Sequence, residues 1–202
     1  YGPLIDPEDI DPDHPYPGNN ICGWMSRKEL RWLYDRAATM DSVVEVGCFI
    51  GRSAHAITMS CPGEVHFVDP WKGLGRSLGG GFGNDTDEIA DSRCWTFMEN
   101  MKALEGKCKA KKISVYRETS MKAVNRFQDK SLDMVFLDGD HATTAVVQDI
   151  LHWLPKVKNL ICGHDYQLKN GAWQAVANVV DGFFGTNIEV HDTIWFCELG
   201  GR

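Results

Sequence analysis

The 202-residue sequence predicts an α/β domain in which helices cover both faces of a mainly parallel sheet. Apolar runs of strand length alternate with segments of helical periodicity along most of the chain. The last two runs are separated only by His191-Asp192, which predicts a closing antiparallel hairpin. The expected strands are 42–47, 64–69, 112–116, 132–137, 157–162, 187–191 and 193–198. The expected helices lie near 26–39, 52–60, 86–105, 120–127, 142–153 and 170–182.

The N-terminal segment 1–22 is expected to form an extended arm ahead of a single domain over 23–202. Prolines at positions 3, 7, 12, 15 and 17 exclude a regular helix or a central strand there. Ser26 suits the N-cap of the first helix, because Glu29 stands three residues later and completes a capping box.

Composition and charge narrow the class of protein. The formal net charge of −7 argues against a nucleic acid as the main ligand. No apolar run is long enough to span a bilayer, and no secretory pattern opens the chain, so no membrane partner is expected. The seven cysteines include no Cys-x-x-Cys pair and no zinc-like spacing, which favours a reducing cytoplasm. A small molecule is the expected partner, and a homodimer is left open.

The stretch from Val43 to Ser53 reads as a short apolar strand, a glycine-spaced turn and the start of a helix. Glycines at 47 and 51 let backbone N–H groups approach a ligand closely, because glycine has no Cβ. The following helix N-terminus suits a carboxylate or a phosphate. A tight strand-to-helix turn needs glycine for purely steric reasons as well, so both interpretations stay open.

Acids and histidines follow the other expected strands. In open α/β sheets the ligand crevice lies beyond the carboxyl ends of the strands, so these residues are expected to gather at one edge. The segments concerned are Asp69-Pro70-Trp71, Glu118-Thr119-Ser120, Asp138-Gly139-Asp140-His141 and Gly163-His164-Asp165-Tyr166.

Each of these residues has a purely structural alternative. Asp69 either accepts the hydroxyls of a ribose or only caps a turn, and Trp71 either covers a ligand or lies in the core. Ser120 could serve only as the N-cap of the following helix. Asp140 could cap the helix beginning near residue 142, which would leave His141 solvated.

Asp138, His164 and Asp165 form the group best suited to chemistry. On adjacent strand ends, their oxygen and nitrogen donors would lie within reach of one divalent ion such as Mg²⁺. The alternative is a set of carboxylates that accept hydrogen bonds from loop N–H groups. Without a metal, His141 or His164 could act as a general base, because the ordinary pKa of histidine lies near neutrality.

Several of these segments resemble class I S-adenosylmethionine (SAM)-dependent methyltransferases, in particular the catechol O-methyltransferase-like branch and methyltransferase family 24. The resemblance runs from about Gly23 to Tyr166 and rests on several motifs in the expected order. These motifs are Gly23-Trp24-Met25-Ser26, Glu45-Val46-Gly47-Cys48-Phe49-Ile50-Gly51-Arg52-Ser53, Val68-Asp69-Pro70, Glu118-Thr119-Ser120, Phe136-Leu137-Asp138-Gly139-Asp140-His141, Asp149-Ile150-Leu151-His152-Trp153-Leu154-Pro155 and Gly163-His164-Asp165-Tyr166.

The resemblance implies a Rossmann-like three-layer sandwich with strand order 3-2-1-4-5-7-6 and SAM as cofactor. It implies that Gly47, Phe49 and Gly51 lie along SAM, that Ser53 contacts its methionine carboxylate, and that Glu45 orients the turn or binds the methionine amino group through water. By the same resemblance, Asp69 takes the ribose hydroxyls, Pro70 and Trp71 lie against the adenine, and Ser120 approaches its edge. Asp138 would lie under the sulfonium or, together with Asp165, hold a divalent cation such as Mg²⁺.

Two departures from the relatives concern the metal and the base. Relatives that use Mg²⁺ commonly follow the second Asp with Asn or Asp, whereas Tyr166 follows Asp165 here. The catechol branch has a lysine base where this chain has Gly139-Asp140-His141.

The glycine-dense stretch 73–84 is expected to form a mobile loop where relatives carry substrate-covering loops.

The first hypothesis is therefore SAM-dependent methyl transfer to a small molecule, with an oxygen nucleophile. Asp138, His141 and His164 are its candidate catalytic residues. The alternatives are a SAM-binding accessory module without turnover and an NAD(P)-dependent oxidoreductase, the latter weakened because the turn lacks the G-x-G-x-x-G pattern.

Overall fold

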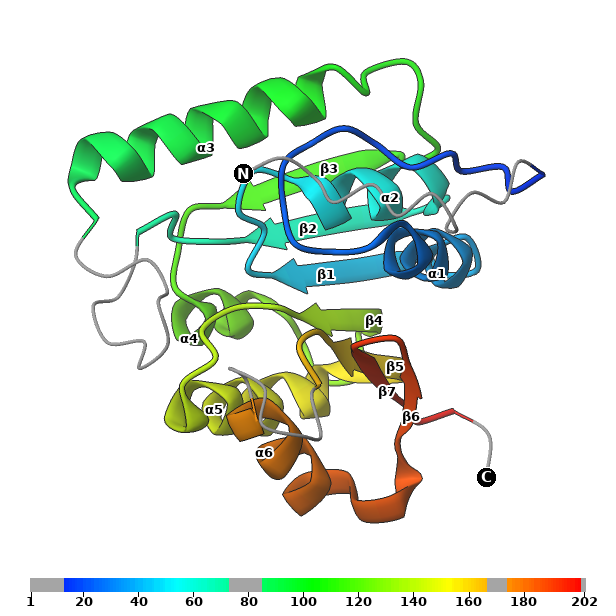
Figure 1. The fold of residues 1–202 in the computed structure, drawn as a ribbon, viewed down its shortest axis with the longest axis vertical. Helices are drawn as coiled ribbons and strands as arrows, with labels where there is room; N and C mark the ends of the chain where they lie inside the picture. The colour runs from blue at the N-terminus through cyan, green and yellow to red at the C-terminus, as the bar shows by residue number, and fades with distance from the viewer. Residues whose placement is uncertain (1–12, 73–84, 167–173, 201–202) are drawn as a thin grey trace.

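A computed structural model describes residues 13–72, 85–166 and 174–200. One seven-stranded sheet runs through the molecule in the order β3-β2-β1-β4-β5-β7-β6 (Figure 1), which confirms the expected fold class and strand order. The strands are β1 (Ser42–Val46), β2 (Glu64–Val68), β3 (Lys112–Tyr116), β4 (Leu132–Leu137), β5 (Val157–Gly163), β6 (Glu189–His191) and β7 (Ile194–Glu198).

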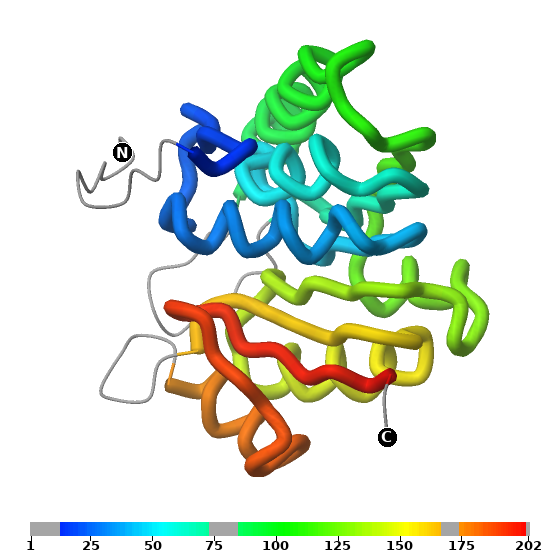
Figure 2. The backbone as a smooth tube through the Cα atoms, turned by 90° about the vertical axis from the view of Figure 1, so that its right-hand side faces the viewer, coloured from blue at the N-terminus to red at the C-terminus, as the bar shows by residue number. Residues whose placement is uncertain are grey.

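Helices cover both faces of the sheet, because successive side chains of each strand point to opposite faces and both faces are apolar. Val43 packs in one core cluster with α1, α2 and α3, and its neighbour Val44 packs in a second cluster with α4, α5 and α6. Figure 2 shows α1 to α3 (blue to green) in the upper part and α6 (orange) in the lower part. The helices are α1 (Arg27–Ala37), α2 (Arg52–Ser60), α3 (Asp87–Lys102), α4 (Ser120–Ala123), α5 (Thr143–Trp153) and α6 (Gln174–Phe184), with 3-10 turns at Val124–Arg126, Leu154–Lys156 and Gly185–Asn187.

The parallel pairing of β1 to β5 places the carboxyl ends of these five strands at one edge of the sheet. β1 pairs in parallel with β2 and β4, β2 pairs with β3, and β4 pairs with β5. β7 runs antiparallel to both β5 and β6, which confirms the closing hairpin. The start of β7 therefore lies at the same edge as the carboxyl ends of β1, β4 and β5.

The turn of this hairpin lies one residue later than expected. His191 still pairs with Ile194, so the two loop residues are Asp192 and Thr193 rather than His191-Asp192. Asp192 adopts a φ of 56°, in the left-handed region that tight hairpin turns require and that aspartate tolerates better than most residues.

The first helix begins as the sequence predicts. The Ser26 side chain accepts from the Glu29 backbone N–H, and the Glu29 side chain accepts from the Ser26 N–H, which completes the capping box. The described part of the last helix, α6, continues to Phe184, two residues beyond the expected end. Its expected start at 170 and the expected loop 73–84 lie outside the described residues.

From residue 13 onward the N-terminal segment has no helix or strand, yet it packs against the domain. Tyr16 is buried, stacks on Tyr34 at 5.0 Å between ring centroids, and its hydroxyl lies 2.9 Å from His55 Nδ1. Arg52 donates to the carbonyls of Ile21 and Met25 at 2.6 and 2.9 Å. The described part of the arm is thereby fixed to the start of α2.

The described residues contain no helix long and apolar enough to cross a membrane. All seven cysteines are free thiols.

Candidate active site

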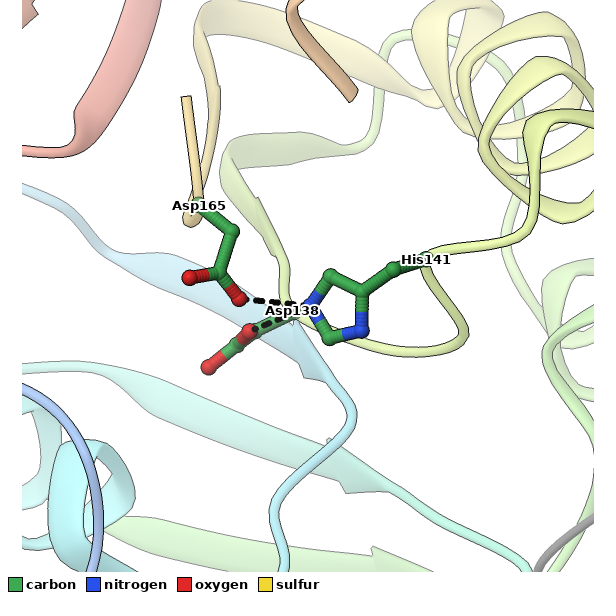
Figure 3. Close-up of side chains that lie close together, drawn as sticks. All are labelled: Asp138, His141 and Asp165. Atoms are coloured by element: carbon green, nitrogen blue, oxygen red, sulfur yellow. Dashed lines mark ion pairs between the residues drawn. The ribbon is translucent and has the colours of Figure 1, made fainter. Parts of the chain in front are cut away.

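Two carboxylates and one imidazole converge at the carboxyl edge of the sheet. Asp138 directly follows β4, Asp165 lies two residues beyond β5, and His141 lies in the loop before α5. His141 Nε2 is 2.7 Å from Asp165 Oδ2 and 3.7 Å from Asp138 Oδ1 (Figure 3). One ligand atom from each of the three side chains lies within 4.8 Å of the others. Parallel pairing of β4 with β5 brings Asp138 and Asp165 together, as the sequence predicts.

The structure separates the two candidate histidines by depth. The His164 side chain is 6% exposed, whereas that of His141 is 22% exposed. His164 Nδ1 faces the same two carboxylates, at 3.6 Å from Asp138 Oδ1 and 3.5 Å from Asp165 Oδ2. A small hollow is lined by both histidines and Asp138, together with residues of α5, α6 and β7, among them Val176. His141 therefore lies at the rim of this cluster, and His164 lies behind it.

The charges in the cluster stabilise one another. Burial lowers the pKa of His141, but the carboxylates of Asp138 and Asp165 outweigh it and raise the pKa to about 9. The pKa of His164 is likewise raised well above its ordinary value, again against the effect of burial. The pKa of Asp165 is lowered, because contacts with both histidines outweigh its burial.

The raised pKa of His141 predicts a pH-dependent stability. The folded-state pKa is about 9 and the ordinary value is 6.5, so the stabilisation is fully present below pH 6.5 and is lost as the pH rises through 9. We expect the free energy of unfolding of the wild type to exceed that of His141→Asn by up to about 3 kcal/mol at pH 6. Urea titrations of both proteins at pH 6, 7.5 and 9.5 in EDTA measure the difference. A gap that stays constant over this range would contradict the assignment.

Strained backbone conformations gather at the same edge. Phe49, Trp71 and Asp165 have φ values of 46°, 53° and 60°, and they follow β1, β2 and β5 respectively. Positive φ is uncommon for residues other than glycine, and bulky residues are true outliers there. Strain of this kind clusters at functional sites, where the surrounding structure holds it in place.

The glycines of the turn after β1 have steric reasons of their own. Gly47 has a φ of 85°, and a Cβ there would lie 2.0 Å from the carbonyl oxygen of Asp138. Gly51 has a φ of 96°, and a Cβ there would meet Met101 and Phe97 at 3.0 and 3.2 Å. Gly51 also serves as the N-cap of α2 without a side-chain hydrogen bond, so the first turn of this helix is left without a side-chain cap.

Ser53 and Glu45 contact each other inside the domain. Ser53 Oγ donates a short hydrogen bond to Glu45 Oε1, and both side chains are buried. Burial raises the pKa of Glu45 well above its ordinary value. Glu45 Oε2 has no hydrogen-bond partner among the described residues. A buried acceptor without a donor is costly, so this oxygen is a buried position where a donor from a ligand would be favourable.

Asp69 binds the glycine turn directly. Its Oδ2 accepts from the backbone N–H groups of Cys48 and Phe49 at 2.8 and 2.9 Å, and its Oδ1 accepts from Trp71 N–H. Burial raises its pKa although these N–H groups oppose the change. Pro70, between Asp69 and Trp71, is half-buried. Asp69 thus links the ends of β1 and β2.

Trp71 lies in the core of the described structure. It is 2% exposed, packs against Phe97 at 5.1 Å between ring centroids, and donates its Nε1–H to the carbonyl of Phe49. Its packing favours the core interpretation over that of a ligand cover.

Ser120 does not cap α4. The N-cap is Thr119, and Ser120 is the first helical residue. Its hydroxyl instead donates a short hydrogen bond to Asp149 and accepts from Trp153 Nε1 at 2.8 Å, which joins α4 to α5. Burial raises the pKa of Asp149 to about 6. Asp140 does not cap α5, because the N-cap is Ala142 and no side chain caps this helix. Its Oδ1 instead accepts from the Ala142 N–H at 2.9 Å, within the loop before α5. His141 is drawn into the cluster rather than left solvated.

Two buried acids in this region were not among the predicted site residues. Asp149 lies in one of the motif segments, but the resemblance to the family assigns it no role. Glu29 lies 3.2 Å from His164 Nε2, yet its spacing from Ser26 predicts only a local capping contact. Nothing in the local sequence pattern indicates a partner 135 positions away.

Comparisons with known proteins identify the family of the chain. Residues 44–166, more than half of the chain, match a family model described as a methyltransferase domain. The chain belongs to this methyltransferase family. It is a SAM-dependent methyltransferase, and SAM is the cofactor of the family. This membership favours methyl transfer over the oxidoreductase and accessory-module hypotheses.

Solved structures show the same fold at low sequence identity. A Corynebacterium glutamicum protein has a TM-score of 0.62 and 11% identity, with 89% of this methyltransferase and 84% of that chain covered. A methyltransferase from Geobacter sulfurreducens has a TM-score of 0.56 and 13% identity, with coverage of 87% and 79%. The O-methyltransferase TomG from Streptomyces achromogenes, involved in tomaymycin synthesis and solved in complex with SAM, has a TM-score of 0.55 and 14% identity, with coverage of 88% and 82%. No curated protein sequence matches the chain.

Proposed function

We propose that this methyltransferase transfers the methyl group of SAM to an oxygen atom of a small molecule held beside Asp138, His141 and Asp165. The observation that carries the proposal is the convergence of these three side chains at the carboxyl edge of the sheet. Methyl transfer needs an aligned nucleophile and an acceptor for its proton. A hydroxyl group must be ionised by a neighbouring group, whereas an unprotonated amine needs no such help, so this cluster favours an oxygen nucleophile.

The proposed SAM site is the edge formed by the turn after β1. The first turn of α2 has no side-chain cap, and its N–H groups and dipole suit the carboxylate of the methionine part of SAM. Glu45 Oε2 fits an ammonium donor, with Ser53 holding the other carboxylate oxygen. A carboxylate has about four acceptor positions, so three N–H donors leave Asp69 room for a ribose hydroxyl.

The remaining cofactor assignments follow the same edge. Gly47, Phe49 and Gly51 form the turn, and Asp138 ends the neighbouring strand. We assign Pro70, Trp71 and Ser120 to the part of the site beside the adenine. The side chains of Trp71 and Ser120 are engaged in contacts within the protein, so these two residues would act by fixing the backbone there.

The cluster also has the donor set for a divalent cation. Asp138, Asp165 and His141 offer two carboxylate oxygens and one imidazole nitrogen within 4.8 Å, a combination suited to Mg²⁺ or Mn²⁺. A cation held there would lower the pKa of an acceptor hydroxyl. His164 is too deeply buried to touch the acceptor and instead supports the two carboxylates.

His141 is the histidine placed to contact the acceptor molecule, because it is the more exposed of the two. Its Nε2 faces the carboxylates of Asp165 and Asp138, so the other ring nitrogen, Nδ1, is the one that can take the hydroxyl proton from an acceptor. The two carboxylates stabilise the imidazolium that results. Because they raise the pKa of His141 to about 9, the neutral form that can act as a base increases as the pH rises toward 9, rather than near neutrality as the ordinary pKa of histidine suggests.

Calorimetry and a labelled-methyl assay test the proposal together. We expect SAM and its demethylated product to bind and NAD not to bind, because the turn lacks the dinucleotide fingerprint. With [methyl-³H]SAM, we expect label to move to members of a panel of small hydroxyl compounds and not to the matched amines. Transfer to amines alone would overturn the oxygen assignment. A rate that is unchanged in EDTA would exclude a role for the cation, and His141 would then be the base.

A further inference from the structure

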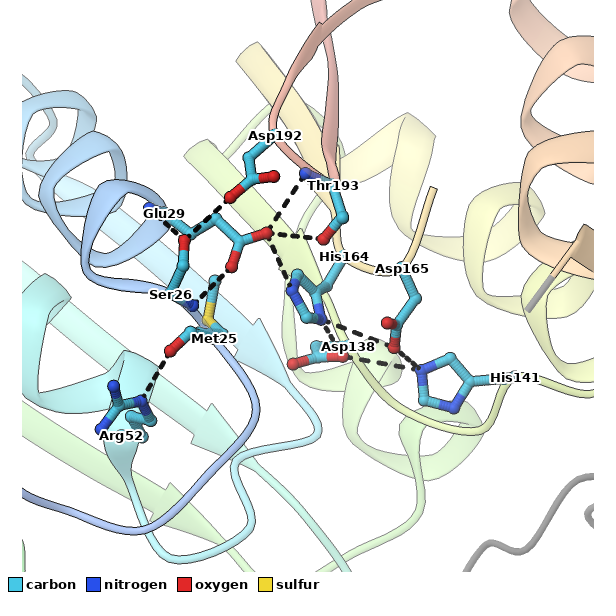
Figure 4. A network of polar contacts seen from close by, with 10 residues as sticks. All are labelled: Met25, Ser26, Glu29, Arg52, Asp138, His141, His164, Asp165, Asp192 and Thr193. Carbon is cyan, nitrogen blue, oxygen red and sulfur yellow. Dashed lines mark hydrogen bonds and ion pairs between the residues drawn. The ribbon is translucent and has the colours of Figure 1, made fainter. Parts of the chain in front are cut away.

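Glu29 makes more contacts than a helix cap requires. It is 3% exposed, and its Oε2 accepts from the Ser26 N–H at 2.7 Å, which is the capping-box contact. Its Oε1 accepts from the backbone N–H of Thr193 at 3.2 Å and from Thr193 Oγ1 at 2.5 Å, and lies 3.2 Å from His164 Nε2 (Figure 4). Glu29 Oε2 thus contacts the start of α1, whereas Oε1 contacts residues just after β5 and in the turn of the β6–β7 hairpin.

The His164 ring lies between Glu29 and the catalytic carboxylates. Nε2 faces Glu29, and Nδ1 faces Asp138 and Asp165 at 3.6 and 3.5 Å. A histidine ring turns about its second side-chain torsion with a broad, roughly two-fold preference. Burial alone therefore does not decide which edge of the ring meets the carboxylates. An ionised carboxylate only accepts hydrogen bonds, so Glu29 fixes Nε2 as the donor on its side.

We propose that Glu29 is a positioning residue of the methyltransferase, which holds the His164 ring so that Nδ1 stays directed at Asp138 and Asp165. The result is a buried line of carboxylate, imidazole and two carboxylates that ends at His141 and the acceptor. The inference rests on the proposed function, because it assigns Glu29 a part in the reaction at that cluster. Partners that orient the ligands of metal sites commonly change metal affinity or activity by ~10- to 100-fold when removed, and we expect an effect of the same size for Glu29.

The competing explanation is that Glu29 only ties α1 to the hairpin between β6 and β7. Two substitutions isolate that structural part. Ser26→Ala removes the other half of the capping box and the contact of Ser26 Oγ with Asp192 at 2.9 Å, without touching His164. Thr193→Val removes the side-chain donor to Glu29 Oε1 and leaves the backbone donor.

The kinetic test compares Glu29→Gln with these controls. We expect Glu29→Gln to lower kcat by ~10- to 100-fold and to change the KM for SAM less than twofold. Ser26→Ala and Thr193→Val are expected to keep kcat within about twofold, even where they lower thermal stability by amounts usual for a lost cap. In a His164→Gln background, Glu29→Gln should have no further effect on kcat, because its influence passes through His164. Additive losses in that double variant would overturn the proposal.

An NMR readout keeps the test independent of turnover. Long-range ¹H–¹⁵N spectra of the His164 ring are expected to show a protected Nε2-bound proton in the wild type, in Ser26→Ala and in Thr193→Val, and its loss or displacement in Glu29→Gln. An unchanged His164 spectrum in a folded Glu29→Gln protein would refute the positioning role. If the wild type transfers no methyl group to any hydroxyl compound but the spectra change as expected, then the proposed function fails while the contact stands.

Discussion

Asp138→Asn is expected to lower the rate of methyl transfer at least ~100-fold, the scale of a lost acid–base or charge contribution, while SAM still binds. Asp138 lies 3.7 Å from His141 and 3.6 Å from His164, so its charge acts on both histidines and on an acceptor molecule held beside His141. Asparagine keeps the shape of the side chain but removes this charge. Initial rates with labelled SAM and calorimetric SAM titrations, made on the same preparation, measure the two quantities separately.

The matched control for Asp138 stands two residues along the same loop. Asp140→Asn also removes one negative charge, but the asparagine oxygen can still accept from the Ala142 N–H. We expect its rate to stay within a fewfold of the wild type. Equal losses in the two variants would mean that the loop rather than the Asp138 carboxylate limits the rate, and a fully active Asp138→Asn would exclude the residue from catalysis.

Gly47→Ala is expected to reduce the free energy of unfolding by more than ~3 kcal/mol, enough to leave little folded protein. The added Cβ would lie 2.0 Å from the Asp138 carbonyl oxygen and 2.7 Å from Gly139 Cα, and both are backbone atoms that a rotamer change cannot move away. The ends of β1 and β4 would have to separate, and the cluster at their edge would separate with them. Urea unfolding, or the soluble yield where the variant does not fold, measures the loss.

The control variant Gly106→Ala measures the cost of a Cβ at a positive φ without the steric clash that is expected at Gly47. Gly106 also has a positive φ, of 73°, but a Cβ there would meet no atom within 4 Å. Its expected cost is therefore only the ~1–2 kcal/mol of a left-handed residue with a Cβ. If Gly47→Ala loses no more stability than Gly106→Ala, the close approach to Asp138 does not limit the fold.

The arrangement of elements could be predicted from the sequence because local signals mark most strand ends. The apolar run 132–137 coincides with β4, and the expected strands at 42–47 and 64–69 each run one residue past the observed end. The order of the strands came from the resemblance to methyltransferases rather than from the runs themselves. Which strands pair is decided by packing across the whole domain, and no window of the sequence contains that information.

In the candidate site, too, the position of a residue at the sheet edge could be predicted, but its individual contacts could not. Asp138, His141, His164 and Asp165 could be predicted to meet, since parallel strands deliver their carboxyl ends to one edge. The partners of individual side chains could not be predicted. Ser53 turns inward to Glu45, and Glu29 reaches His164, because these contacts depend on side-chain directions and on elements distant in the chain.

The antiparallel course of β7 has a consequence for the order in which the protein matures on the ribosome. Thr193 is synthesised 164 residues after Glu29, yet its backbone N–H and its hydroxyl both donate to Glu29 Oε1. A nascent chain that has folded β1 to β5 can place Glu29 beside His164 but still lacks these two donors. The row of buried polar contacts is therefore complete only after the hairpin has been synthesised and has packed onto β5, and we expect a chain truncated before Asp192 to lose methyl transfer although most of the sheet is in place.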